Sequence, residues 1–348
     1  MKPQTLQKTA LALLVGWYAA NAAAYSEQGQ AGNTKSWESA EYLKDWGLTS
    51  MNASTAYALG FNGSGVKIGV MDSGVLLNHP EFQDGRIHVV KTEGTYSKDG
   101  MRYPDASVGN GPINKNEPVK NGKRNFDKTD NGIFTKGEAF NIDGAWHKYT
   151  NDAHGTHVGG TMAASRDGNE MHGVAFGANL YSANTGGNDN MTYGPNQDYS
   201  FFLQGYSALA DAGAKVINNS WGSNRRVNSS FAGALGYKPK YNWRDVPEYG
   251  VQYYDVPKAP EPISSPAAHI YLSNLGEAEK AYYQFVTSGE KNFVDAAYEV
   301  AKNKQVIQVF TAGNRSMMAE SFTRAMLPYF RPDAEKYWVN VTGQVGGE

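Results

Sequence analysis

Five short apolar segments recur along this 348-residue chain, and stretches with helical periodicity lie between them. Short apolar runs of this kind are typical of strands that are buried on both faces of a parallel sheet. Alternation of such strands with helices predicts an α/β fold, here a doubly wound, mostly parallel sheet with helices on both faces. The predicted strands are 66–71, 179–183, 215–220, 305–310 and 338–341.

Helical periodicity is clearest at 200–212 and 292–302, where apolar residues recur at spacings of three and four and so line one helix face. A shorter helix is predicted over 52–60, with Asn52 or Ser54 as its N-cap and Gly60 as its stop. The core face of the two longer helices is predicted to comprise Phe202, Leu203, Tyr206, Leu209, Ala210, Phe293, Ala296, Ala297, Val300 and Ala301.

The N-terminus has the composition of a secretory signal peptide over residues 1–24, with an ordinary N-terminal helix as the alternative. Lys2 and Lys8 accompany an apolar stretch at 10–20 that is too short to cross a membrane, and alanines at 22–24 suit a cleavage site. We expect no transmembrane segment after it. The prediction is therefore a bacterial protein that is secreted or held at the cell surface.

Composition limits the partners and the sources of stability. The formal net charge of -2, from 32 basic and 34 acidic residues, gives no electrostatic attraction to nucleic acid or to an anionic membrane. The chain has no Cys, so no disulfide stabilises it, and its core and any bound ions must do so. We divide the mature chain into an N-terminal lead at 25–60 and one domain at 61–348, with surface insertions at about 91–150 and 223–288.

Two motifs carry residues suited to acid–base chemistry. Asp72 ends the first predicted strand, and the carboxyl ends of parallel strands are where functional groups gather. His154 opens the segment His-Gly-Thr-His-Val-Gly-Gly-Thr at a predicted helix start, with a following helix at 161–165 and glycines that permit close packing. Asp72 could instead cap a turn. His154 and His157 could instead bind a metal, although the zinc motif spaces its histidines by four, and otherwise we expect His157 in the core or behind the site.

Two more segments follow predicted strands. Asn-Ser-Trp-Gly at 219–222 leaves the third strand, and Thr-Ala-Gly-Asn at 311–314 leaves the fourth. Taken singly, the first could be a strand leaving the core and the second a plain turn. Their order after the Asp and His motifs gives them more weight than either has alone.

In this order the four segments resemble the subtilisin family of serine proteases, over about residues 47–348. The resemblance implies that Asp72 orients His154, that His154 is the general base, and that Asn314 donates to the oxyanion. It also implies that Ser220, Trp221 and Gly222 bind an extended polypeptide substrate, with Trp221 shaping a pocket.

The resemblance implies no required cofactor and no catalytic metal. Calcium is a common structural ion in the family, and carboxylates such as Asp127, Asp130 and Asp143 could bind it. Large insertions behind a signal peptide also resemble the passenger domains of bacterial autotransporter serine proteases, which implies an outer-membrane translocator in the intact protein.

The family's nucleophilic serine lies in Gly-Thr-Ser-Met-Ala-x-Pro, and no such segment occurs in residues 1–348. The stretch 323–328 is faintly similar but has no serine and precedes the strand at 338–341, while Ser316 and Ser321 fit neither motif nor order. We therefore expect a domain that is incomplete at its C-terminus, with the serine beyond Glu348. By itself such a chain should be inactive and prone to aggregation.

The main hypothesis is thus a secreted serine endopeptidase with an Asp-His-Ser triad. The alternative is a non-catalytic, peptide-binding pseudo-protease that kept the groove and lost the nucleophile. A metal-dependent hydrolase using His154 and His157 is a minor third hypothesis and would require chelator-sensitive activity.

Overall fold

The computed structural model describes most of the predicted core and part of each insertion. The described residues are 29–101, 133–146, 153–185, 198–221, 242–246, 251–255, 291, 293–311 and 327–341. The predicted signal peptide, the residues Gly222 and Asn314, and the faint serine-motif echo at 323–326 lie outside them. Among the described residues, every helix is too short or too polar to cross a membrane.

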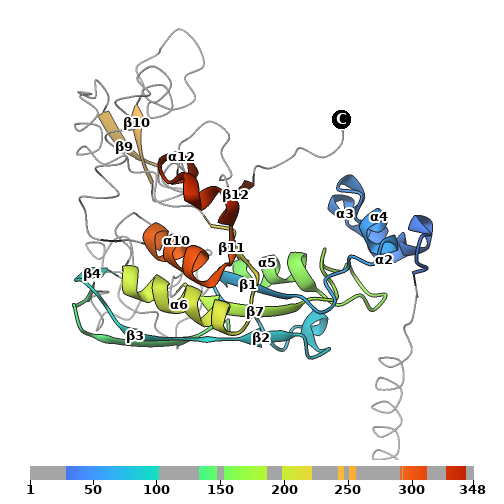
Figure 1. Ribbon diagram of the computed structural model, residues 1–348, viewed down its shortest axis with the longest axis horizontal. Coiled ribbons are helices and arrows are strands. Elements are labelled where there is room, and N and C mark those ends of the chain that lie inside the picture. Colours follow the sequence, from blue (N-terminus) through green and yellow to red (C-terminus); the bar gives the residue numbers. More distant parts are fainter. Residues whose placement is uncertain are drawn as a thin grey trace, which may run out of the picture.

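Six of the described strands form one sheet in which every pairing is parallel (Figure 1). Their order is β12-β11-β8-β1-β7-β2, so β1 lies between β7 and β8 near the middle. All five predicted strands are present, and the predicted doubly wound parallel sheet is confirmed. The strands are β1 (Lys67–Asp72), β2 (Ile87–Val89), β7 (Asn179–Asn184), β8 (Val216–Asn219), β11 (Ile307–Thr311) and β12 (Trp338–Val341).

The remaining elements are mostly short. The longer helices are α5 (His154–Ala163), α6 (Tyr199–Asp211) and α10 (Phe293–Lys304). The short helices are η1 (Thr34–Trp37), α2 (Ala40–Lys44), α3 (Trp46–Ser50), α4 (Ala53–Ala58), η2 (Pro80–Phe82), α12 (Leu327–Phe330) and η4 (Pro332–Tyr337). The strands outside the main sheet are β3 (Lys91–Thr95), β4 (Gly100–Met101), β5 (Ile133–Phe134), β6 (Ala139–Asp143), β9 (Asn242–Val246) and β10 (Val251–Asp255).

Successive side chains of β1 pack on opposite faces of the sheet. Val70 packs with Leu180 of β7 and Val158 of α5 on one face. Met71 packs with residues of α6 and α10 on the other. Both side chains are fully buried, as expected where successive strand residues point to opposite faces and both faces are covered. The predicted helices on both faces are confirmed.

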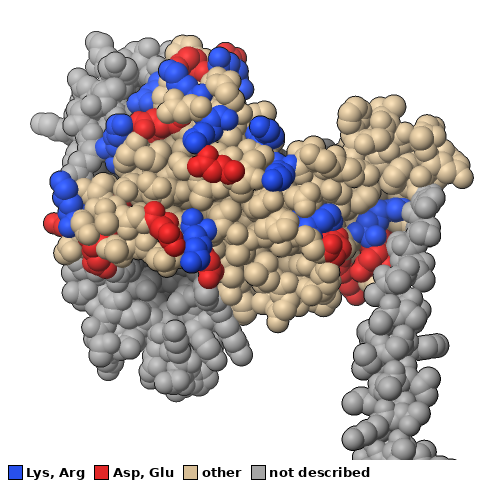
Figure 2. All heavy atoms as spheres, turned by 60° about the horizontal axis from the view of Figure 1, so that its bottom comes forward, with Lys and Arg blue, Asp and Glu red and all other residues tan. Residues whose placement is uncertain are grey.

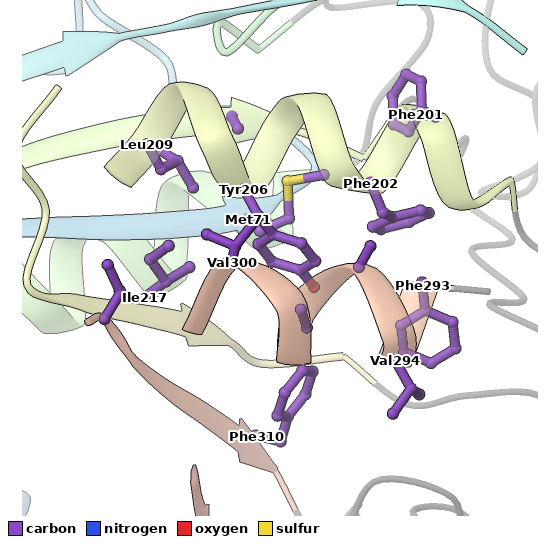
Figure 3. Packing of buried hydrophobic residues seen from close by; sticks show 14 of the residues in the cluster. Met71, Phe201, Phe202, Tyr206, Leu209, Ile217, Phe293, Val294, Val300 and Phe310 are labelled. Atoms are coloured by element: carbon purple, nitrogen blue, oxygen red, sulfur yellow. The ribbon is translucent and has the colours of Figure 1, made fainter. Parts of the chain in front are cut away.

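Helices α6 and α10 lie together over one face of the sheet and enclose its largest apolar cluster (Figure 3). Phe202, Tyr206 and Leu209 are buried as predicted, while the predicted core residues Leu203 and Ala210 are only partly buried. The buried face of α6 includes Phe201, which the sequence pattern did not place there.

Phe201 is buried because a second ladder packs on α6. Strands β3 and β6 pair antiparallel, and the rings of Tyr96 and Phe140 lie 6.3 and 5.0 Å from that of Phe201. Asp198, the N-cap of α6, also accepts hydrogen bonds from the backbone of Ser97 and Lys98. Within the predicted insertion at 91–150, the described strands β3 and β6 are therefore packed against α6. Within 223–288 the described residues form an antiparallel pair, β9 and β10.

Charged side chains of both signs are interspersed on the face shown in Figure 2. Several form exposed pairs, among them Lys302 with Asp333 and Lys304 with Asp211, at 2.8 and 2.7 Å. Exposed pairs of this kind each contribute little to stability.

The N-terminal lead is anchored on the segment that follows α5. The hydroxyl of Tyr57 donates to the carbonyl of Val174 at 2.7 Å, and the Glu41 carboxylate accepts from the amides of Asp167 and Gly168. The predicted helix at 52–60 is present but shorter. Its N-cap, Asn52, adopts a left-handed conformation (φ 57°) without a capping side-chain bond.

A buried histidine lies at the centre of this anchor. His172 is 2% exposed and is surrounded by the rings of Tyr42, Tyr57 and Phe176 at 5.0 to 6.0 Å. Its Nδ1 is 2.9 Å from the Gly173 carbonyl, and its Nε2 is buried without a hydrogen-bond partner among the described residues. Burial, assisted by the positive charge of Arg166, lowers the pKa of His172 below its ordinary value of 6.5.

This lowered pKa predicts acid destabilisation. As pH falls below about 6.5, the unfolded chain binds a proton at His172 before the folded chain does, so the free energy of unfolding should decrease. His172→Phe keeps an aromatic ring in the cluster and removes the titration, and should flatten that dependence. The measurement is urea unfolding from pH 7.5 to 5, with the exposed His157→Gln as control. Equal pH dependence in His172→Phe and the native chain would contradict the prediction.

Candidate active site

Asp72 and His154 meet where β1 ends and α5 begins. The Asp72 Oδ1 and the His154 Nδ1 are 2.8 Å apart, and these residues are 82 positions apart in the sequence. The Asp72 side chain is fully buried, whereas 42% of the His154 side chain is exposed. The predicted acid and base are therefore brought together, with the base facing outward at the carboxyl edge of a parallel sheet.

The carboxylate of Asp72 is held by its own backbone as well as by the histidine. Its Oδ1 also accepts from the Ser73 amide at 2.7 Å, and its Oδ2 is buried without a hydrogen-bond partner among the described residues. An ionised carboxylate only accepts, so the imidazole Nδ1 must donate to it and Nε2 is the basic nitrogen. That tautomer is the one a general base requires.

Glycines let the helix start approach the end of β1. A Cβ on Gly155 would lie 2.5 Å from the Gly74 carbonyl oxygen, and Gly74 itself has φ +90° with Ala145 too close for a side chain. Gly159 packs against Val75 and Leu180, as the sequence predicts. Gly160 does not, because nothing lies within 4 Å of where its Cβ would be. Helix α5 starts at His154 and contains these glycines, rather than following them at 161–165.

Sequence reasoning missed a supporting residue on the neighbouring strand. Asn184, at the end of β7, is opposite Asp72 in the parallel register and is 1% exposed. Its side-chain amide donates to the carbonyls of Ser73 and Ala145 at 3.3 and 3.2 Å. A polar residue at the carboxyl end of a predicted strand, the criterion that selected Asp72, would have found it.

The predicted substrate-binding segment starts directly after β8. The Ser220 hydroxyl accepts from the Asn218 side chain at 2.8 Å. Trp221 is 4% exposed, packs against Phe202, Phe293 and Phe310, and donates from Nε1 to the Met71 carbonyl at 2.7 Å. Its indole is therefore buried in the core, and the predicted substrate contact of Trp221 stays a prediction.

Within the described part of the chain, His154 and His157 belong to no cluster of metal-ligating side chains. His157 is exposed, which also corrects the expectation that it lies in the core or behind the site. Among the described residues, no three His, Cys, Asp or Glu side chains are grouped so as to hold a metal ion. Of the suggested calcium carboxylates, Asp143 accepts from the Ala145 amide at 2.9 Å, while Asp127 and Asp130 lie outside the described residues.

Residues 63–344 match the sequence model of the subtilase family. The chain belongs to the subtilase family. The family consists of serine endopeptidases, and the sequence resemblance carried by the four motifs is thereby confirmed.

Similar proteins agree with this assignment. An "Extracellular serine protease" of Serratia marcescens is 29% identical over 96% of this subtilase and 26% of its own length. "Bacillopeptidase F" of Bacillus subtilis is 29% identical over 74% and 16% of the two chains. The chain thus spans about a quarter of the length of the Serratia relatives it matches.

A solved structure of fervidolysin from Fervidobacterium pennivorans is described as a keratinolytic enzyme related to subtilisin. It aligns with 80% of this chain and 27% of its own at 17% identity. The TM-score of 0.33 is too low to add to the family assignment.

The different surroundings of Gly155 and Gly160 predict opposite effects of substituting these two glycines of α5 by alanine. Gly155→Ala should force its Cβ into the Gly74 carbonyl, destabilise the fold by about 1–3 kcal/mol and separate His154 from Asp72. Gly160→Ala meets open space within the same helix, so it should stabilise the fold by up to about 1 kcal/mol. Chemical denaturation of both variants checks this, and equal effects of the two substitutions would contradict it.

Proposed function

We propose that this subtilase is a secreted serine endopeptidase that hydrolyses peptide bonds. The observation that carries the proposal is the 2.8 Å contact between a fully buried Asp72 and a part-exposed His154. A buried acid that orients an accessible imidazole is the arrangement that activates a hydroxyl nucleophile.

In the proposed reaction His154 accepts the proton of a serine hydroxyl as that oxygen attacks the scissile carbonyl. The imidazolium is stabilised by Asp72, and the same proton then passes to the leaving amine. Asn314 donates to the oxyanion, and the backbone at 220–222 pairs with the extended substrate. The proposal requires a nucleophilic serine, and residues 1–348 do not contain the Gly-Thr-Ser-Met-Ala-x-Pro motif that carries it in the family.

Secretion is part of the same proposal. The signal-peptide composition of residues 1–24 supports it, as does the word "extracellular" in the names of the Serratia relatives. An outer-membrane translocator in the intact protein and a structural calcium ion are further proposals, supported only by the resemblance to autotransporter proteases and by the family's use of calcium.

Active-site labelling separates a protease from a peptide-binding pseudo-protease. The native secreted protein is treated with a fluorophosphonate, which modifies an activated serine, and its intact mass is measured. We expect a labelled species heavier than the 37.9 kDa of this chain. An unlabelled secreted species that ends at Glu348 and binds extended peptides without turnover would instead favour the pseudo-protease.

Substitution of the pair tests the assigned roles. In the native secreted protein, Asp72→Asn and His154→Ala should lower kcat by on the order of 10⁴-fold and 10⁶-fold, the scale known from a subtilisin. The exposed His157→Ala, on the same helix, is the matched control and should retain native kcat on a peptide substrate. Loss of turnover in the control alone, or full activity of His154→Ala, would refute the assignment.

A further inference from the structure

Helix α5 begins without a capping side chain of its own. The residue before His154 is Ala153, which has no side-chain acceptor, and its ψ of 3° is not the extended conformation from which a cap normally reaches the first turn. The first amides of a helix have no partner within the helix and need one from elsewhere. The helix that carries the general base is therefore capped by another element, or not at all.

The missing acceptor is supplied by Ser73, which follows the catalytic acid. Its hydroxyl accepts from the Gly155 amide at 2.8 Å, and its side chain is fully buried. Its own amide donates to the Asp72 carboxylate at 2.7 Å. One residue thus contacts the acid through its backbone and the helix of the base through its side chain.

We propose that Ser73 is a positioning residue for the Asp72–His154 pair. Its hydroxyl provides from a neighbouring element the N-cap that α5 lacks, and so fixes His154, the first residue of that helix, against Asp72. The consequence for catalysis rests on the proposed function, whereas the effect on the geometry of the pair does not.

A second hydrogen bond, in the opposite direction, also connects the segment after β1 to the start of α5. The hydroxyl of Thr156, in the first turn of α5, accepts from the amide of Leu76 at 3.0 Å. The segment after β1 thus accepts a backbone hydrogen bond from α5 through Ser73, and α5 accepts one from that segment through Thr156. Both bonds lie next to the close backbone contact at Gly155. Two such bonds oppose both sliding and rotation of the helix start relative to the end of β1.

Removal of the Ser73 hydroxyl should loosen the pair more than it harms the fold. Ser73→Ala leaves the Gly155 amide buried without its acceptor, so the start of α5 can move away from Asp72. A misplacement of about 1 Å can lower a rate by on the order of 10²-fold. In the native secreted enzyme we therefore expect a loss of that size in kcat with KM little changed.

A spectroscopic experiment tests the positioning directly and needs no turnover. An imidazole proton that is hydrogen-bonded to a carboxylate gives a strongly deshielded NMR signal, which ¹⁵N-histidine labelling detects and His154→Gln assigns by its loss. We expect this signal in the native secreted protein, and we expect it to be broadened away or shifted upfield in its Ser73→Ala variant. Because the readout requires no nucleophile, its failure is distinct from a failure of the proposed function, which fluorophosphonate labelling reports.

Ser182→Ala is the matched control. Ser182 is also a fully buried serine of this sheet, and its hydroxyl donates to the Gly144 carbonyl at 2.8 Å without touching Asp72 or His154. It should lose comparable stability in chemical denaturation and keep the deshielded signal. If Ser73→Ala also keeps the native signal, or if the native secreted protein has none, the proposal is overturned.

A milder variant covers the case in which Ser73→Ala does not fold. Thr156→Val removes the reciprocal hydroxyl at a part-buried position and conserves the shape of the side chain. An upfield shift of the His154 signal in this variant supports the proposal that the hydrogen bonds between the segment after β1 and α5 position His154. An unchanged signal in a folded Thr156→Val, with Ser73→Ala unfolded, counts against it.

Discussion

The hydrogen bond between Asp72 and His154 depends on how closely two pieces of backbone approach one another. Because residue 155 is a glycine, the first turn of α5 can lie directly against the backbone of Gly74. A Cβ at this position would be only 2.5 Å from the Gly74 carbonyl oxygen. Gly74 in turn has the positive φ that leads the chain away from β1 towards Ala145. The acid and the base are 82 residues apart, and this contact of glycine backbones lets their side chains come within 2.8 Å.

The parallel sheet supplies the rest of the geometry. Strand β1 pairs in parallel with β7 and β8, so the carboxyl ends of all three strands lie at the same end of the sheet. Asp72, Asn184 and Ser220 lie at or directly after these three strand ends. Edges of this kind gather polar groups in doubly wound folds, since the strand order reverses there and leaves a crevice. Asn184 is therefore part of the support of the site, as its hydrogen bonds to the carbonyls of Ser73 and Ala145 indicate.

The sequence predicted the parts that depend on local pattern. Strands such as β1 are buried on both faces and so have continuous apolar runs, and the four motifs preserve the order of a known family. What it could not predict depends on distant contacts. Phe201 is buried only because Tyr96 and Phe140 pack on it, and β2 has too few residues for any pattern. Trp221 resembled a pocket residue, yet its indole completes the core.

The position of Trp221 links the core to the site. Its indole donates to the Met71 carbonyl, and Met71 immediately precedes Asp72 in β1. The Met71 side chain lies under Gly205 of α6, where a Cβ would come within 2.9 Å of its terminal methyl. The end of β1 is thus held from one face by α6 and Trp221, and from the other by α5 through Gly155 and Ser73. Because these contacts belong to different layers, substitutions around Trp221 should alter mainly stability, whereas substitutions at Gly155 should alter both stability and the geometry of the acid–base pair.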